Sequence, residues 1–342
     1  MRLSRILGLI GVIVLLIAAW VVYQLWGPSV SLHEKKYLYV SASISREQLT
    51  KQLQQEGFLT STYWFSLVSA QLDLQKIKAG RYEIKPGMSV IQLVRMFRNG
   101  KQSYVNLSIV KERTVQQLAG KIGNRTDTRI DSLECVSFLS NNDSLRKFGV
   151  DTNTVLSIVM PFTYSIGWAE TPGQILEKMN ERYLQFWDST RTKKAAAKGL
   201  TPLQVSILAS IVEEESNRQE DRYKIASTYL NRLRIGMKLQ ADPTVKYVTR
   251  NFGLKRILFE HLALNSPYNT YRISGLPPGP ICTPSVKSIE AVLEAPDTDY
   301  LFFVASYKFD GTTLFSSSYA QHQAYVKLFH AEQERRIKNV MP

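Results

Sequence analysis

The chain has 342 residues, long enough for two folded domains besides a targeting segment. Hydrophobic residues make up 44% and charged residues 21%, which excludes a disordered chain as the default. Lysine and arginine exceed aspartate and glutamate by 14, so the surface is expected to attract polyanions; nucleic acid, an anionic membrane and a carboxylate-bearing polymer all fit that charge.

The N-terminus carries a segment that fits a membrane span. Ile6–Trp26 has no formal charge and, at about 1.5 Å per residue, is about 32 Å long, close to the hydrocarbon thickness of a bilayer. Arg2 and Arg5 precede it, which favours a cytoplasmic N-terminus. A cleaved signal peptide is the alternative, but the stretch exceeds an h-region of about 7–15 residues and no small-x-small cleavage site follows. We therefore predict that residues 1–26 form a retained anchor in inner-membrane lipid. The rest of the chain is then extracytoplasmic, which argues against nucleic acid as a partner.

After a linker at 27–36, residues 37–103 are predicted to form a small module of strands and helices. A strand at 37–43 is followed by helical pattern at 45–57 and by the alternating strand RYEI at 81–84. Pro86-Gly87 makes a turn, Ser89 is a good N-cap for the next helix, and Asn99-Gly100 ends it. Residues 104–160 begin with a strand and a helix (114–122) and become polar and weakly patterned at 125–151, so we expect a connecting region there.

Residues 161–342 alternate long helices with motif-rich loops. Helices are predicted at Pro172–Trp187, Pro202–Ser216, Asp221–Ile235, Pro284–Glu294 and Ser318–Lys338. Asp310-Gly311 lies between YLFFVASYKF and TTLF and predicts a hairpin with a two-residue turn. The fold class that follows is α+β: an N-terminal transmembrane helix, a small module, and a mixed α/β domain.

The sequence offers few ligands for a metal. Cys135 and Cys282 are the only cysteines, and one disulfide or two isolated thiols are both open. The four histidines are scattered, and neither HExxH nor GxSxG occurs. We therefore predict no metal and no cofactor.

The sharpest chemical signal is TPLQVSILASIVEEES at 201–216. Thr201 with Gln204 forms a capping box, and Pro202 takes the first helical position. At about 100° per residue, Glu215 extends the apolar stripe, whereas Ser206, Ser210, Glu213 and Glu214 fall on a side expected to be solvated. A carboxyl on an apolar face should have a raised pKa, as a general acid near neutral pH requires. A frayed helix end with a solvated Glu215 is the alternative.

Two loops downstream could line a cleft. LQADPTVKYV (239–248) contains Asp242, which could also be only an N-cap. SPYNTYRISGLPPGPICTPS (266–285) brings tyrosine rings, an amide and hydroxyls together, a mixture that suits a carbohydrate, although the tyrosines could equally pack beneath the loop.

Together these segments resemble the MltG (YceG-like) family of endolytic murein transglycosylases. The resemblance is carried by long blocks in the right order: ILASIVEEES, LNRLRIGMKLQADPTVKY, SPYNTYRISGLPPGPICTPS and LEAPDTDYLFFVA. KAGRYEIKPGMSVIQLVRMFRNGK (78–101) is similar to the LysM-like subdomain of that family. The resemblance implies a LysM-like subdomain at 37–103 and a catalytic domain at 161–342.

The resemblance also implies a lyase reaction on peptidoglycan glycan strands. Glu215 would protonate the MurNAc–GlcNAc glycosidic oxygen and then act as base on the C6 hydroxyl of the same muramic acid, which leaves a 1,6-anhydro end and limits the length of nascent strands. Substrate-binding residues implied in this way are Gln240, Asp242, Tyr268, Asn269 and Tyr271. Membrane-bound peptidoglycan synthases are a further partner hypothesis.

Two positions depart from the family pattern, and two other functions stay open. Phe162 stands where the family often has an acid, and Thr313 stands near a position that is usually histidine. One alternative is a water-using glycoside hydrolase with Asp242 as base. The other is a non-catalytic peptidoglycan-binding scaffold anchored in the membrane.

Overall fold

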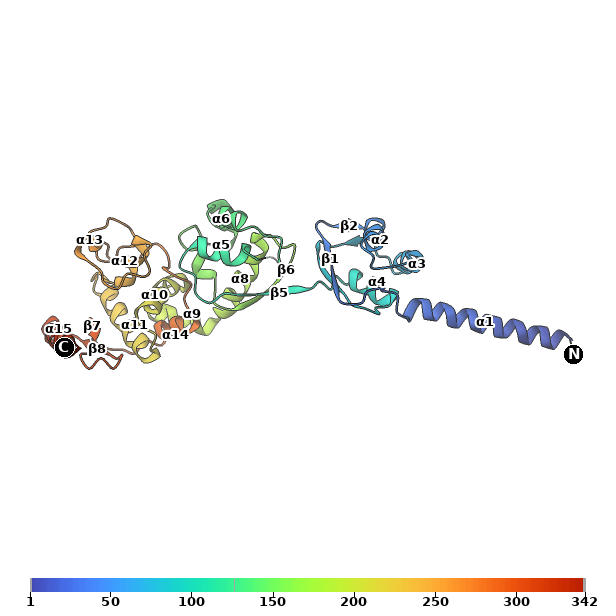
Figure 1. The fold of residues 1–342 in the computed structure, drawn as a ribbon. Coiled ribbons are helices and arrows are strands. Elements are labelled where there is room, and N and C mark those ends of the chain that lie inside the picture. The colour runs from blue at the N-terminus through green and yellow to red at the C-terminus, as the bar shows by residue number, and fades with distance from the viewer. Residues whose placement is uncertain (1, 126, 341–342) are drawn as a thin grey trace. The chain divides into compact units, whose positions relative to one another are not determined.

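The computed structural model describes residues 2–125 and 127–340 and confirms an α+β fold (Figure 1). Contacts within the chain divide it into two compact units. The N-terminal unit comprises Met1–Leu107, Arg125–Ile130 and Ser165–Thr171, and the C-terminal unit comprises Ser108–Asn124, Asp131–Tyr164 and Pro172–Pro342.

The N-terminal unit begins with an apolar helix, α1 (Arg2–Trp26). Its segment Arg5–Trp26 has a mean hydropathy of 2.8 and is not buried by the rest of the chain, so by length and composition it is suited to cross a membrane. The remaining elements of this unit are β1 (Lys36–Val40), β2 (Ile44–Ser45), α2 (Arg46–Gln55), α3 (Tyr63–Gln71), β3 (Lys76–Ile77), β4 (Gly80–Ile84), α4 (Val90–Arg98) and β5 (Tyr104–Ser108), the last reaching the unit's boundary.

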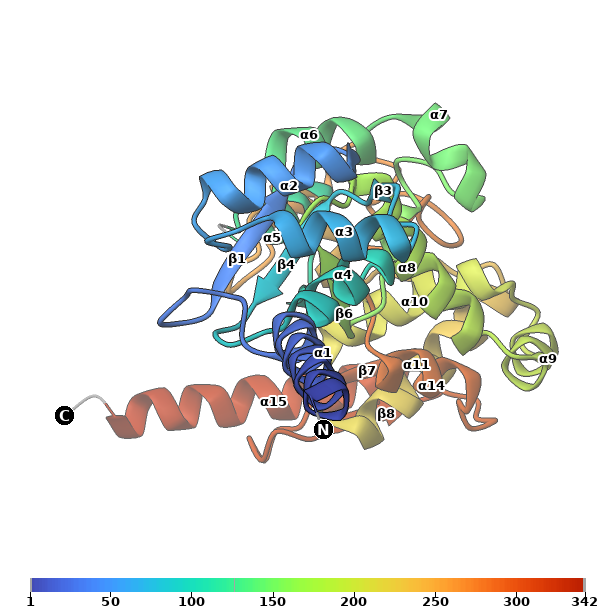
Figure 2. The ribbon, with the colours of Figure 1, turned by 90° about the vertical axis from the view of Figure 1, so that its right-hand side faces the viewer.

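Short strands and capped helices build the small module after α1. β1 pairs antiparallel with β4, and β2 with β3. The predicted N-cap Ser89 forms a capping box with Gln92 at the start of α4. The helices α2, α3 and α4 lie on the side that faces the viewer in Figure 2. Their inner faces enclose a core that includes Phe65, Tyr82 and Phe97.

The C-terminal unit is mostly helical. Its elements are α5 (Val115–Gly123), α6 (Ser132–Leu139), α7 (Asn142–Leu145), η1 (Arg146–Phe148), η2 (Val155–Ile158), α8 (Pro172–Phe186), α9 (Ser189–Ala197), α10 (Pro202–Glu215), α11 (Gln219–Arg234), α12 (Asp242–Thr249), α13 (Phe259–Leu262), α14 (Val286–Leu293), β7 (Phe302–Ala305), β8 (Thr313–Ser316) and α15 (Tyr319–Val340). The strand β6 (Thr163–Gly167) straddles the boundary between the units and pairs with β5. All five helices predicted for 161–342 occur, each within two residues at either end.

The weakly patterned segment at 125–151 contains helices. α6 packs on α5, and Cys135, Leu139 and Leu145 are buried there. These helices are short, so too few apolar positions repeat to give a clear periodic signal. Cys135 and Cys282 are both buried free thiols, which decides between the two alternatives left open by the sequence.

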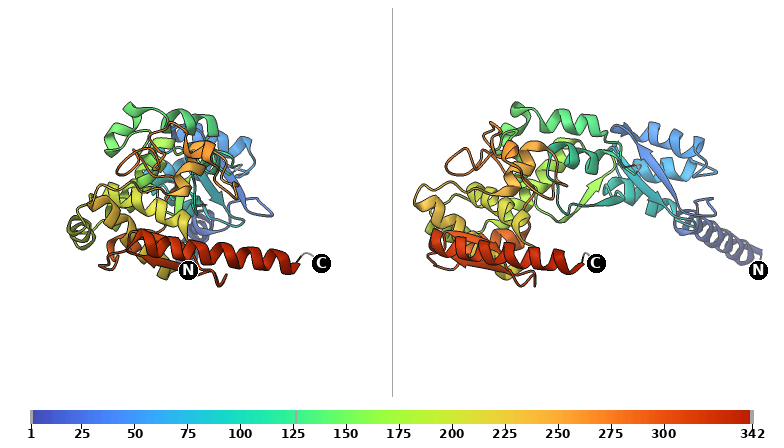
Figure 3. Two further views of the ribbon diagram at one scale, coloured as in Figure 1. Left: turned by 90° about the vertical axis from the view of Figure 1, so that its left-hand side faces the viewer. Right: turned by 60° about the vertical axis from the view of Figure 1, so that its left-hand side comes forward.

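The predicted hairpin forms, but its turn is longer than two residues. β7 and β8 pair antiparallel from Phe302 opposite Ser316 to Ala305 opposite Thr313, which leaves residues 306–312 as the loop. Phe309 and Gly311 both have positive φ, 54° and 75°, so Asp310-Gly311 is only part of a wider loop. α15 runs beside this hairpin (Figure 3).

Candidate functional site

The helix α10 carries Glu215 at its C-terminal end. The capping box of Thr201 and Gln204 and the N-terminal Pro202 are present as the sequence predicted. Every residue from Val205 to Val212 is buried, including Ser206 and Ser210. The expectation of a solvated side was therefore wrong. Because α9, α11, α12 and α14 all contact α10, the central part of this helix has no exposed face.

The two preceding glutamates are held by partners within the protein. Glu213 pairs with Arg222 at 3.2 Å and accepts hydrogen bonds from the hydroxyls of Ser285 and Ser288. The hydrogen bonds from Ser285 and Ser288 therefore fasten the end of α10 to the start of α14. The expectation that Glu213 lies in solvent was wrong, since only 11% of its side chain is exposed.

Glu214 is enclosed by two cations. Lys111 and Arg113 each approach a carboxylate oxygen of Glu214 to 3.0 Å. Burial alone would raise the pKa of Glu214, but hydrogen bonds from Arg113 and Lys111 outweigh it and hold that pKa below its usual value. Glu214 is therefore an ionised structural group.

Glu215 is held differently, by a neutral hydroxyl. Tyr229 on α11 donates a hydrogen bond of 2.5 Å from Oη to Oε1 of Glu215. Burial raises the pKa of Glu215 to about 7, against the opposing effect of the Tyr229 hydrogen bond; the charge of Asp242 adds to the increase. A carboxyl with this pKa holds or releases a proton readily at neutral pH, which general acid/base catalysis requires.

Tyr229 is itself fixed in the core. Its side chain is 1% exposed, and its ring packs edge-on against Phe303 with centroids 5.7 Å apart. Burial and the adjacent carboxylate of Glu215 raise the pKa of the Tyr229 hydroxyl well above its usual value, so it stays a proton donor. The position of the Glu215 carboxyl is thus set by a rigid neighbour.

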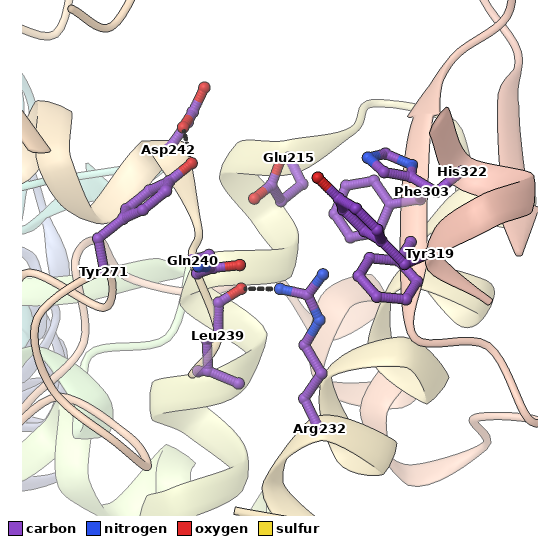
Figure 4. Close-up of a pocket in the computed structure, with 10 residues that line it drawn as sticks. Glu215, Arg232, Leu239, Gln240, Asp242, Tyr271, Phe303, Tyr319 and His322 are labelled. Atoms are coloured by element: carbon purple, nitrogen blue, oxygen red, sulfur yellow. Dashed lines mark hydrogen bonds between the residues drawn. The ribbon is translucent and has the colours of Figure 1, made fainter. Parts of the chain in front are cut away.

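Glu215 opens into a pocket of about 280 Å³ (Figure 4). Leu239, Gln240, Asp242 and Tyr271 line one side of it in the figure, and Phe303, Tyr319 and His322 line the other. Phe302 completes the lining, together with Arg232 below Glu215. A carboxyl of raised pKa, polar groups and aromatic faces therefore converge on one cavity.

Arg232 is a buried cation at this pocket. Its Nε donates to the carbonyl of Leu301 at 2.7 Å and its Nη1 donates to the carbonyl of Leu239 at 2.6 Å, which ties the two sides of the pocket together. The other terminal nitrogen points into the pocket (Figure 4). Burial lowers the pKa of Arg232, but the group stays positive at neutral pH. It can bind a carboxylate or a carbonyl oxygen of a ligand.

Three of the five residues predicted to bind substrate line this pocket with Glu215. Gln240 has a positive φ of 49° and its backbone N–H donates to the carbonyl of Thr270. Asp242 accepts a hydrogen bond of 2.6 Å from the hydroxyl of Tyr271. The N-cap of α12 is Ala241, so Asp242 lies inside the helix rather than capping it.

Asn269 lies away from the pocket, in the base of the loop. Its side chain is fully buried, and its Nδ2 donates to the carbonyls of Leu262 at 3.1 Å and Leu264 at 2.8 Å. Its Oδ1 accepts from the backbone N–H of Tyr271 at 3.1 Å. Asn269 therefore positions Tyr271, which does line the pocket.

Tyr268 also lies outside the residues that line the pocket. Its ring is 4.8 Å from that of Tyr247, and its hydroxyl is 3.4 Å from Oδ1 of Asn153. A Cβ at Gly279 would lie 2.0 Å from the carbonyl oxygen of Asn153 and 2.9 Å from the hydroxyl of Tyr268, so the chain approaches too closely there for any other residue. These contacts hold the 266–285 loop in place.

Sequence reasoning missed six of the ten residues that line the pocket. One signal was available on α11, because Tyr229 and Arg232 are three residues apart and so share a helix face. Tyr319 and His322 have the same spacing on α15. The ring of His322 stacks on that of Phe302, with centroids 5.3 Å apart, and burial lowers the pKa of His322.

The two positions that depart from the family pattern are not among the residues that line the pocket. The guanidinium of Arg182 lies over the ring of Phe162 at 5.2 Å. The hydroxyl of Thr313 donates to Oδ2 of Asp221 at 3.0 Å. Both side chains support neighbouring helices of the C-terminal unit.

Comparison with known proteins gives the family. Residues 38–328 match the model of the YceG-like family. The chain belongs to the YceG-like family. A relative named "Endolytic murein transglycosylase" from Bacillus subtilis (strain 168) is 28% identical over 260 residues, covering 72% of this chain and 71% of that protein. A protein of the same name from Streptococcus pneumoniae (strain ATCC BAA-255 / R6) is 26% identical over 330 residues, covering 87% of this chain but only 59% of its own length.

A solved structure of a YceG-like protein shares this fold. The crystal structure, of a protein from Listeria monocytogenes, is 26% identical in sequence, with a TM-score of 0.55. The match covers 86% of this chain and 99% of that one. Both units described above thus belong to a YceG-like fold, and the family match extends over α10, the 266–285 loop and the hairpin.

Proposed function

We propose that this chain is an endolytic murein transglycosylase, a lyase that cleaves the MurNAc–GlcNAc bond of nascent glycan strands. The observation that carries the proposal is Glu215, whose pKa is raised to about 7 at a pocket with both polar and aromatic walls. The names of the bacterial relatives support the same reaction. The product would carry a 1,6-anhydro-MurNAc end, and cleavage would limit strand length during cell-wall synthesis.

In this reaction Glu215 acts twice. Its protonated carboxyl gives a proton to the glycosidic oxygen as the C1–O bond of MurNAc breaks, and the GlcNAc alcohol leaves. The carboxylate then takes the proton of the C6 hydroxyl while that oxygen bonds to C1, which restores the acid. An intramolecular nucleophile is already positioned, so the step gains from proximity and needs no water. Tyr229 orients the carboxyl through its 2.5 Å hydrogen bond.

The pocket walls would hold the sugars on either side of the broken bond. Gln240, Asp242 and Tyr271 offer polar groups to hydroxyls, and the aromatic side chains opposite offer faces to the CH groups of sugar rings. Tyr268 and Asn269 would contribute to substrate binding indirectly, by holding the loop that carries Tyr271.

A water-using hydrolase is the second candidate, because Asp242 lines the same pocket as Glu215. In that reaction Asp242 would activate water, and the product would be a reducing end. Its hydrogen bond with Tyr271 places the carboxylate at the pocket edge, where a water could reach it. A peptidoglycan-binding scaffold without catalysis is the third.

Mass spectrometry of purified glycan strands separates these candidates. The full chain in detergent is compared with Glu215→Gln and with Glu181→Gln, a matched control at an exposed glutamate of α8. New ends one water lighter than reducing ends, produced by the wild type and the control but not by Glu215→Gln, are expected. Reducing ends would indicate the hydrolase. Binding without cleavage by all three proteins would indicate the scaffold.

We further propose an inner-membrane location in which Ile6–Trp26 is a single span, the N-terminus is cytoplasmic and the rest is periplasmic or otherwise extracytoplasmic. In this arrangement residues 37–103 are a LysM-like subdomain that binds the wall, 104–160 connect, and 161–342 catalyse. The apolarity of α1 and the cell-wall names of the relatives support it. Protease accessibility in spheroplasts tests the topology. The chain would also associate with membrane-bound peptidoglycan synthases. Co-purification in mild detergent tests this association, and failure to co-purify would argue against it.

A further inference from the structure

The last turns of α1 pack directly on the small module of the N-terminal unit. The rings of Trp20 and Trp64 meet edge to face with centroids 5.6 Å apart, and the guanidinium of Arg95 lies 5.7 Å from the centre of the Trp26 ring. Leu25 packs against the core of the module. The backbone N–H of Ser29 donates to the carbonyl of Met88 at 3.0 Å. The helix that would cross the membrane is therefore attached to the module by side chains as well as by the chain itself.

The contact between Trp20 and Trp64 sets a depth. Six residues separate Trp20 from Trp26, which is about 9 Å along a helix. If the span Ile6–Trp26 matches the hydrocarbon thickness, Trp26 lies where the hydrocarbon meets the outer headgroups, and Trp20 with its partner Trp64 lies about 9 Å below that boundary. Interfacial helices bury their apolar faces about 5–10 Å into this boundary. Aromatic side chains favour this region.

The start of α3 suits such a position. Tyr63 is 65% exposed and Leu67 is 48% exposed, on either side of Trp64 in the sequence. The rings of Tyr63 and Trp64 contact each other at 5.4 Å. Apolar and aromatic groups gathered on the surface next to a membrane span are typical of an interfacial contact.

A basic pocket of about 460 Å³ lies along α4, the helix that contacts both α1 and α3. Lys85, Arg95 and Lys101 bring three positive charges to it, and Met88, Gln92 and Met96 supply the rest of the lining with Glu83. Glu83 reaches only Lys85, at 3.8 Å, so the pocket keeps a net positive charge. Since Arg95 also lies over Trp26, the pocket is at the level of the headgroups.

We propose that this membrane face, made of Tyr63, Trp64, Leu67 and the basic pocket, inserts its aromatic side chains into the outer leaflet and binds the phosphate of an anionic phospholipid in the pocket. Lysine and arginine are the groups that bind phosphate. The proposal rests on α1 spanning the membrane and is independent of the chemistry of Glu215. It implies that the module is held flat on the bilayer rather than swinging on a flexible tether.

Tryptophan fluorescence in nanodiscs made with acyl-brominated phosphatidylcholine tests the aromatic contact. The full chain has five tryptophans, at positions 20, 26, 64, 168 and 187. If Trp64 enters the bilayer, lipid quenches three of the five tryptophans, those at positions 20, 26 and 64. Trp64→Phe then lowers the quenched fraction to two of four. If Trp64 stays outside, the fraction rises from two of five to two of four and the proposal is overturned. Trp187→Phe is the control, and it must raise the fraction in either case. If no tryptophan is quenched, α1 does not span the bilayer.

Native mass spectrometry of the full chain, released from micelles that contain equal phosphatidylglycerol and phosphatidylcholine, tests the pocket. The chain should retain phosphatidylglycerol preferentially. Replacing Lys85, Arg95 and Lys101 with Gln should reduce that preference by about fivefold for each cation removed. Gln at Lys51, Lys76 and Lys78, which are exposed cations elsewhere on the module, should leave the preference unchanged.

Three results would overturn the lipid assignment. Equal retention of both lipids would show that the pocket does not recognise an anionic headgroup. An equal loss in the control variant would show a diffuse charge effect. Displacement of phosphatidylglycerol by inorganic phosphate at millimolar concentration would show a site for free phosphate instead. Glu215→Gln should retain phosphatidylglycerol as the wild type does, which separates this proposal from the proposed function.

Discussion

Replacing Tyr229 with Phe should move the alkaline limb of glycan cleavage to higher pH. The hydroxyl of Tyr229 donates to Glu215 at 2.5 Å and is one of the groups that favour the ionised carboxylate. Removing this donor leaves the carboxyl in the same buried position without that stabilisation. The pKa of Glu215 must therefore rise above its value of about 7.

The size of the shift follows from hydrogen-bond energies. A hydrogen bond to a charged group contributes about 1.5–3 kcal/mol, and one between neutral groups contributes about 0.5–1.5 kcal/mol. The carboxylate therefore loses about 1–1.5 kcal/mol more than the protonated carboxyl does. At about 1.4 kcal/mol per pH unit, the pKa of Glu215 should rise by about one unit.

The assay is kcat/KM for glycan cleavage against pH. The general acid must be protonated, so activity falls as pH rises through the pKa of Glu215, and a higher pKa keeps the enzyme active to higher pH. Tyr164→Phe is the matched control, because its hydroxyl is also buried but donates to the carbonyl of Met160. An alkaline limb that stays in place or moves down in Tyr229→Phe would refute the role of this hydrogen bond and the assignment of Glu215 as the acid.

Three further substitutions test the site. Glu215→Gln should raise Tm at pH 8 but not at pH 4, because ionisation of a carboxyl whose pKa is raised from 4.5 to about 7 opposes folding as pH rises through that range; equal changes at both pH values would contradict this. Glu214→Gln should lower stability at pH 7 by about 1–2 kcal/mol, since Lys111 and Arg113 lose their anion while staying 31% and 29% exposed. Because the pKa of Glu214 is lowered, this deficit should shrink as pH falls toward 3, and a constant deficit in thermal unfolding would argue against the ion pairs. Asp242→Asn should slow cleavage but keep anhydro products by mass spectrometry, and complete loss of cleavage would favour the hydrolase.

Short-range patterns in the sequence predicted the secondary-structure elements well. Each capping box, at Ser89 and at Thr201, is formed by residues within a stretch of four, and both helices begin at the predicted N-cap. Helix periodicity likewise placed Glu215 on a buried stripe, and its pKa is raised as expected. The Asp310-Gly311 turn failed because the loop length depends on where strand pairing ends, which two residues cannot specify.

The same periodicity could not show how completely α10 is enclosed. A helical wheel separates apolar from polar positions, and it assigned Glu213 and Glu214 to solvent. The structure instead provides Arg222 for the first and Lys111 with Arg113 for the second, from segments between 9 and 103 positions away. Compensation of a buried charge by distant cations is a tertiary property and leaves no local pattern.

The sequence by itself determined the apolar N-terminal helix, the α+β class, the family resemblance and the end of α10 as the place for a carboxyl of raised pKa. Each depends on neighbours along the chain or on long blocks in order. Only the tertiary structure decided that Tyr229 holds Glu215, that Arg232 and the β7–β8 hairpin with α15 form the far side of the pocket, and that Asn269 supports the loop instead of lining the pocket. The physical reason is that a pocket is defined by side chains that converge from separate elements, and the packing of those elements is set by the whole core.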